Sequence, residues 1–137
     1  MTPAGYSGTP LARKLGLEDG QRLLLLGAPP GYLDTTLVPR PPALTFVETA
    51  SPAVDIAHAF LSDAESLAAL LRDWRRTLRP DAVVWISWPK KASRVPTTIT
   101  EDVIREQALP LGWVDVKVCA VDAVWSGLKL VVRQALR

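Results

Sequence analysis

The feature of this sequence that most constrains its fold is a series of short apolar runs that do not alternate with polar residues. The first covers residues 21–27, where four leucines stand between two glycines, and further runs cover 43–47, 53–61 and 82–88. A half-buried strand alternates, whereas a strand covered on both faces is apolar throughout. The runs therefore predict a parallel sheet between helices, with these residues buried on adjacent strands: Leu23–Leu26, Ile56 and Val83–Ile86.

Helix signals lie between the runs. Residues 28–42 contain five prolines, which leave room for at most a short turn of helix there. Elsewhere we expect three helices, at about 10–15, 62–78 and 100–109. In the first helix, Thr9 is the expected N-cap before Pro10, and Gly16 ends the helix. The second begins with a capping box of Ser62 and Glu65, and Thr100 is the N-cap of the third.

The last segment changes its period. Apolar residues alternate with polar ones over 114–120 and again over 128–132, and a turn near residues 122–125 joins the two stretches. Alternation by two is typical of half-buried strands, so we expect an antiparallel hairpin at one edge of the sheet. The predicted fold class is α/β, three-layered, with a mostly parallel sheet and a C-terminal antiparallel hairpin.

Composition limits the chemistry. The 137 residues are expected to form one domain, 1–137, with an N-terminal arm at 1–8. The net charge of +2, from 16 basic and 14 acidic residues, argues against a surface made for nucleic acid, and no stretch is long and apolar enough to cross a membrane. We expect a cytoplasmic protein. Because Cys119 is the only cysteine and His58 the only histidine of the sequence, we expect no intrachain disulfide, no metal site and no catalytic His triad.

The second half of the chain resembles the S-adenosylmethionine-dependent methyltransferase fold. The turn Leu78-Arg79-Pro80-Asp81 into residues 82–88, and the segment Thr100–Trp113 before the hairpin, look like the end of that fold. The resemblance implies a shortened methyltransferase-like Rossmann fold over about residues 53–133. It also implies a cofactor site after the first strand, at Gly27 and Gly31, with Glu48 for the ribose.

Two prolines, Pro29 and Pro30, stand inside that turn, where backbone donors are wanted. We therefore expect no cofactor, and no binding of S-adenosylmethionine at physiological concentration. A second resemblance covers nearly the whole chain. The phrases GYSGTPL (5–11), WPKK (88–91), VKV (116–118) and WSGLK (125–129) are similar to a family of short uncharacterised bacterial proteins, which implies no activity.

One candidate ligand site follows from the fold class. Trp88, Lys90 and Lys91 end a predicted parallel strand, the edge at which open α/β sheets bind ligands, and two ammonium groups there suit an anion. The arm before the first helix offers hydroxyls and free amides, which also suit an anion. We predict that both segments face one crevice. The arm residues are Tyr6, Ser7 and Thr9.

A second candidate surface lies on the hairpin, where a rim for a protein partner is predicted at Lys117, Trp125, Ser126 and Lys129. Lysines on an edge strand also serve solubility alone. We interpret His58 as a core residue and Cys119 as inert packing. The basic residues Arg72, Arg75, Arg76, Arg79, Lys90, Lys91 and Arg94 are interpreted as a solvated face rather than a nucleic-acid stripe, since no aromatic residues accompany the arginines.

Three functions remain open. The leading hypothesis is a methyltransferase-like domain without catalysis that binds a protein partner or a small anionic ligand. One alternative is a methyltransferase that uses S-adenosylmethionine at Gly27–Gly31 and Glu48 on an unknown acceptor. The other is an accessory protein associated with nucleic acid, whose binding would weaken steeply with salt.

Overall fold

The computed structural model describes residues 8–137 and centres on one sheet of six strands. The order across the sheet is β2-β1-β3-β4-β6-β5. Strands β1 to β4 run parallel, and the hairpin of β5 and β6 joins antiparallel to β4 through β6. The strands are β1 (Arg22–Leu26), β2 (Thr45–Val47), β3 (Ile56–Phe60), β4 (Val83–Pro89), β5 (Trp113–Ala120) and β6 (Trp125–Val132). This confirms the predicted mostly parallel sheet with its terminal hairpin.

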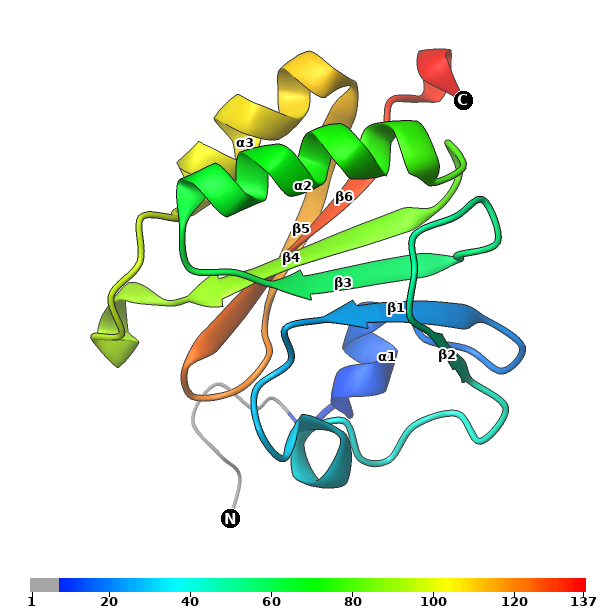
Figure 1. The fold of residues 1–137 in the computed structure, drawn as a ribbon. Coiled ribbons are helices and arrows are strands. Elements are labelled where there is room, and N and C mark those ends of the chain that lie inside the picture. The colour runs from blue at the N-terminus through cyan, green and yellow to red at the C-terminus, as the bar shows by residue number, and fades with distance from the viewer. Residues whose placement is uncertain (1–7) are drawn as a thin grey trace.

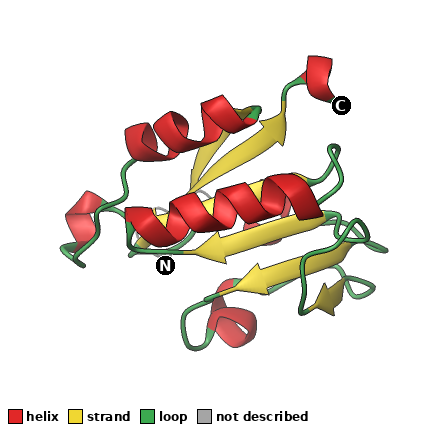
Figure 2. Ribbon diagram, turned by 45° about the horizontal axis from the view of Figure 1, so that its top comes forward, coloured by secondary structure: helices red, strands yellow, loops and turns green. Residues whose placement is uncertain are grey.

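Helices cover both faces of the sheet, which gives three layers (Figure 1; Figure 2). Helices α2 (Ala64–Thr77) and α3 (Glu101–Ala108) lie on one face, called here the α2 face. Helix α1 (Leu11–Leu15) and the π-helix η1 (Tyr32–Thr36) cover the other, the α1 face. Short 3₁₀ turns complete the chain: η2 (Lys91–Ser93), η3 (Leu109–Leu111) and η4 (Gln134–Leu136). No helix of residues 8–137 has the length and hydropathy that a membrane span needs.

The apolar core divides at the sheet into two clusters. On the α2 face, Leu67, Leu71 and Trp74 of α2 pack against strand residues such as Val84 and Ile86. On the α1 face, the buried residues of α1 pack with Leu23, Ile56 and Trp85, and the Trp85 indole donates to the Leu15 carbonyl oxygen at 3.0 Å. The apolar runs of β3 and β4 thus have cover on both faces, as predicted, whereas the run at residues 43–47 forms an edge strand whose Phe46 is exposed.

The prediction that Leu23–Leu26 and Val83–Ile86 are all buried is wrong at the end of β1 and at the start of β4. Leu23 and Leu24 are buried, but Leu26 is 42% exposed, and Leu25 and Val83 are half-buried. Leu26 shares a face with Leu24, since strand residues two apart point the same way. Helix α2 lies over β3 and β4 rather than over the end of β1, in line with the exposure of Leu26 (Figure 1).

The expected helix starts also need correction. The N-cap of α2 is Asp63, whose carboxylate accepts from the Ser66 amide at 2.8 Å, and not Ser62. The N-cap of α1 is Pro10, without a side-chain hydrogen bond, and not Thr9. The cap of α3 at Thr100, the stop at Gly16 and the short helix between the prolines are confirmed.

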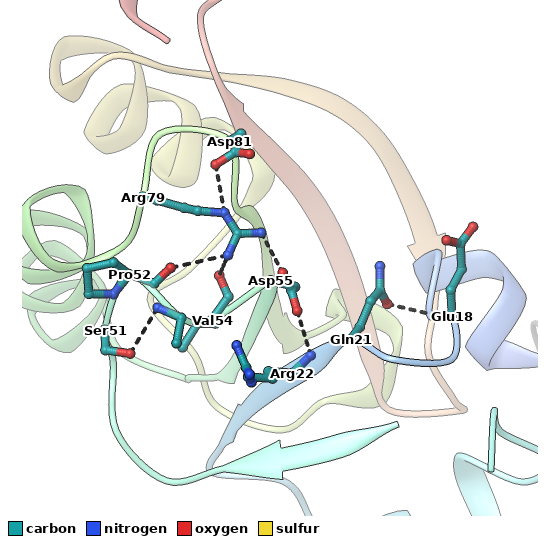
Figure 3. Close-up of polar contacts among 10 residues, drawn as sticks. Glu18, Gln21, Arg22, Ser51, Pro52, Val54, Asp55, Arg79 and Asp81 are labelled. Atoms are coloured by element: carbon teal, nitrogen blue, oxygen red, sulfur yellow. Dashed lines mark hydrogen bonds and ion pairs between the residues drawn. The ribbon is translucent and has the colours of Figure 1, made fainter. Parts of the chain in front are cut away.

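An ion-pair group fixes the amino edge of the sheet (Figure 3). The Arg79 guanidinium, from the turn between α2 and β4, contacts the carboxylates of Asp55 and Asp81. It also donates to the carbonyl oxygens of Pro52 and Val54 at 3.2 and 3.0 Å. The second Asp55 oxygen accepts from the backbone amide of Arg22 in β1 at 2.7 Å. One arginine thus joins the α2–β4 turn to β1 and to the segment before β3.

Candidate functional site

The parallel strands β1, β3 and β4 end at the same edge of the sheet, and the turn after β1 is shaped by two glycines. Gly27 has φ +72°, and a Cβ there would lie 2.8 Å from the carbonyl oxygen of Phe60 in β3. Only glycine allows this close approach in this conformation. Gly31 also has a positive φ, +78°. The turn therefore folds back onto the end of β3 and stays exposed at the sheet edge.

The prolines do not remove every donor from this turn. The amides of Ala28 and Gly31 form no hydrogen bond with any residue of the described range, 8–137. They flank Pro29 and Pro30, and the Pro29 carbonyl oxygen accepts from the Tyr32 amide at the start of η1 at 3.1 Å. These two amides are therefore candidate donors to a ligand at the turn.

Glu48 lies at the same edge, one strand away. Val47 pairs with Leu24, so Glu48 follows the end of β2 beside the end of β1. Its side chain is exposed and forms no ion pair with another described residue. By contrast, the carboxylate of Asp63 at the end of β3 caps α2. The Glu48 carboxylate is thus available to a ligand that binds across the β1 turn.

A pocket of about 700 Å³ opens at the end of β4, on the α2 face. We call it the β4 pocket. Its walls come from the end of β4, from the segment leading into α3, from the first turns of α3 and from the start of β6. The lining residues are Trp88, Pro89, Lys90, Lys91, Val95, Pro96, Thr97, Ile99, Thr100, Glu101, Asp102, Arg105 and Ser126.

Charges in the β4 pocket fall into two groups. Arg105 contacts Glu101 at 2.9 Å, Asp102 at 3.2 Å and Asp115 of β5 at 3.0 Å. Hydrogen bonds that the Arg105 guanidinium donates to Asp115 and Glu101 raise the pKa of Arg105, and the same guanidinium holds the pKa of Asp115 below its usual range. Lys90 and Lys91 form no ion pair with any described residue.

The α1 face holds a buried polar group. His58 is 1% exposed, its Nε2 lies 2.6 Å from the Ser87 hydroxyl, and burial lowers its pKa to about 3. Its Nδ1 and the Tyr32 hydroxyl have no hydrogen-bond partner within residues 8–137. Burial, and then the charges of Cys119 and Asp122, raise the pKa of Tyr32. His58 is therefore a core residue, as interpreted, but its ring is satisfied at one nitrogen only.

The structure brings together part of the predicted ligand site. Trp88, Lys90 and Lys91 line one pocket. Tyr6 and Ser7 lie outside the described residues, so the predicted crevice with the arm stays a prediction. Thr9 is described, yet it does not line the β4 pocket, and it precedes a helix that packs on the opposite face of the sheet.

One of the four residues of the predicted partner rim, Ser126, lies apart from the other three, because successive strand residues point to opposite faces. Ser126 lines the β4 pocket on the α2 face. Trp125 packs edge-to-face on Phe60 at 5.2 Å on the α1 face. Lys117 and Lys129 are cross-strand partners in the hairpin. Cys119 is half-buried, and burial raises the pKa of its thiol, in line with packing rather than reactivity.

Sequence reasoning missed the acidic and guanidinium wall of the β4 pocket. The spacing of Glu101 and Arg105, four residues apart on a helix, was the available signal. Arg79 belongs to the ion-pair group of Figure 3, and Arg75 donates to the Leu111 carbonyl oxygen at 2.8 Å, so these two are not part of a free basic face. No cluster of three or more potential metal ligands occurs in residues 8–137.

Comparison with known proteins gives a clear answer for the fold only. No family model matches the sequence, and no curated protein matches it, so the similarity to the family of short bacterial proteins stays a prediction. Solved structures do match. A SAM-dependent methyltransferase from Aquifex aeolicus aligns with a TM-score of 0.63 at 14% identity, over 89% of this chain and 88% of the other.

Two further structures agree. A putative type 11 methyltransferase from Sulfolobus solfataricus has a TM-score of 0.60 at 13% identity, over 83% of this chain and 85% of its own. Fibrillarin from Aeropyrum pernix, solved with natively bound S-adenosyl-L-methionine, has a TM-score of 0.55 at 17% identity, over 88% of this chain and 72% of the fibrillarin chain. With its central parallel strands and terminal hairpin, the chain has the Rossmann-like fold of SAM-dependent methyltransferases.

Proposed function

We propose that this protein is a methyltransferase that binds S-adenosylmethionine across the turn after β1 and methylates an acceptor whose identity is open. The observation that carries the proposal is the turn itself. Gly27 lies against Phe60, Gly31 is left-handed, and the amides of Ala28 and Gly31 have no hydrogen-bond partner within residues 8–137, at the edge where α/β folds bind ligands. The proposal reverses the expectation drawn from Pro29 and Pro30, since donors remain on both sides of them.

The residues present fit such a cofactor in type and place. The amides of Ala28 and Gly31 would donate to its carboxylate or ribose oxygens, and the exposed Glu48 carboxylate would accept from ribose hydroxyls. The cofactor supplies a methyl group on a positively charged sulfur, already activated for transfer. The protein then has to bind, orient and exclude water, and needs no nucleophile of its own. His58 is buried on the α1 face and cannot reach this edge as a base.

Calorimetric titration of the full chain tests the proposal. We expect wild type to bind S-adenosylmethionine and S-adenosylhomocysteine with micromolar dissociation constants. Glu48→Gln should weaken binding about tenfold, which is about 1.4 kcal/mol. Glu106→Gln, which removes an exposed carboxylate from α3, serves as the matched control and should bind as wild type does. Absence of binding at millimolar cofactor would overturn the proposal.

A second candidate function is supported by the β4 pocket. Lys90 and Lys91, which form no ion pair within residues 8–137, line it, and this favours the binding of a small anion by a domain that has the methyltransferase fold without the activity. The cofactor titration separates the two candidates. Methyl transfer from radiolabelled S-adenosylmethionine to any component of a cell extract would decide for the enzyme.

A further inference from the structure

We propose that the β4 pocket binds a small organic anion whose oxyanion group contacts Lys90 and Lys91. Such a ligand consists of an apolar body and a single oxyanion group. The site differs from the proposed cofactor site, because none of its lining residues belongs to the β1 turn or to the end of β2. The proposal therefore does not depend on methyltransferase activity.

The size and walls of the pocket suit a small molecule. Its volume, about 700 Å³, falls within the range of ligand sites, about 300–1,000 Å³. Trp88, Pro89 and Ile99 are buried and form apolar wall, while Val95 is 41% exposed beside Pro96 at the mouth. An exposed valine and proline at the opening of a hollow gain from contact with an apolar ligand.

The charges select the sign of the ligand. Glu101 and Asp102 also line the pocket, but both carboxylates contact the guanidinium of Arg105, which carries a third carboxylate on its other side. With three carboxylates on one guanidinium, this wall keeps a net negative charge, so the positive end of the pocket is the one formed by Lys90 and Lys91. Lys90 and Lys91 have no such partner within residues 8–137, and neighbouring ammonium groups repel each other. An oxyanion between them relieves that repulsion.

A free hydroxyl completes the polar side. Ser126 lies opposite Trp88 in the β4–β6 ladder, and its hydroxyl makes no hydrogen bond to a described residue. The Thr97 hydroxyl, in contrast, already donates to the Ser62 carbonyl oxygen at 2.7 Å. Ser126 is therefore a lining hydroxyl that can both donate to and accept from a ligand, whereas the Thr100 hydroxyl, which accepts from the Val103 amide, keeps only its donor.

The test is a calorimetric titration of the full chain with three probes that share one apolar body: 2-naphthoate, 2-naphthyl phosphate and 2-naphthol. The first two carry the oxyanion and the third is neutral at neutral pH. We expect both anions to bind and 2-naphthol to bind at least tenfold more weakly. The tighter of the two anions identifies the head group as carboxylate or phosphate. No binding of either anion at millimolar concentration, or equal binding of 2-naphthol, would overturn the proposal.

Matched variants locate the site. Lys90→Ala with Lys91→Ala should weaken anion binding at least tenfold, whereas Lys117→Ala with Lys129→Ala removes the same charge from the hairpin and should change it less than threefold. Val95→Asp places a carboxylate at the mouth on an exposed loop residue, and should also weaken binding at least tenfold. It keeps the test available if the first variant unfolds. Equal losses in the two lysine pairs, or wild-type affinity in Val95→Asp, would refute the site.

Discussion

Replacing Arg79 by methionine should lower the free energy of unfolding by about 2 kcal/mol, the scale of one or two hydrogen bonds to charged groups. The methionine keeps most of the apolar stem and removes four contacts of the guanidinium (Figure 3). The contact with Asp55 carries most of the effect, because the side chains of Arg79 and Asp55 are 32% and 27% exposed. Asp81 is 69% exposed, and a pair screened by solvent to that degree adds little.

Urea unfolding followed by circular dichroism measures the loss, and thermal unfolding should show a fall in Tm of about 6–10 °C for a chain of this size. Arg76→Met is the matched control. Its partner Asp73 lies 3.9 Å away, with both side chains mostly exposed, so we expect a change within about 0.5 kcal/mol. Equal stability of the two variants would refute the assignment of Arg79 as the residue that fixes the amino edge.

The same pair has a pH signature. Burial disfavours the Asp55 carboxylate, but hydrogen bonds from the Arg22 amide and the Arg79 guanidinium outweigh it, so the pKa of Asp55 is lowered. Because the folded pKa lies below the unfolded one, the stabilisation is complete above the ordinary value of 3.8 and is lost as pH falls through the folded pKa. The difference between wild type and Arg79→Met should therefore shrink in acid. A difference that stays constant down to about pH 2 would contradict this account.

Three further outcomes are expected. Gly27→Ala should cost about 1–3 kcal/mol more than Gly20→Ala, because both have a positive φ but only the first would press a Cβ on the Phe60 carbonyl oxygen; urea unfolding compares them. Because burial lowers the pKa of His58 to about 3, its NMR signals should not titrate between pH 5 and 8. Protonation then favours the unfolded chain, so the free energy of unfolding should fall by up to about 1.4 kcal/mol per pH unit below 6.5. The His58→Leu variant should lack this dependence on pH. Trp85→Phe should lose about 1–2 kcal/mol with its hydrogen bond to α1, and speed amide exchange there.

Local patterns predicted most of the fold. Unbroken apolar runs marked β1, β3 and β4, and the change to alternation marked the hairpin. Errors fell where a residue depends on what lies above it. Leu26 continues the leucine run, yet it projects beyond the helices, which no pattern within residues 21–27 could show. Strand β3 begins at Ile56 rather than near 53, because residues 51–55 form the turn that Arg79 holds.

The candidate site was less predictable, because it depends on parts of the chain that are distant in sequence. The rule that open α/β sheets bind ligands at the carboxyl ends of their strands directed attention to Lys90 and Lys91 after β4, and both residues line the β4 pocket. Strand alternation alone predicts that Trp125 and Ser126 lie on opposite faces of the sheet. The sequence could not predict the contact between Arg105 of α3 and Asp115 of β5, because that contact depends on how the helix packs on the sheet.

The position of β6 inside the sheet bears on how the chain folds during synthesis. Strand β6 is made after β5, yet it lies between β4 and β5. Strand β5 therefore has no neighbour in the sheet until residues 125–132 have left the ribosome, and β4 keeps an open edge until then. Such an edge can pair with other nascent chains. Pairing of β6 with β4 covers that edge.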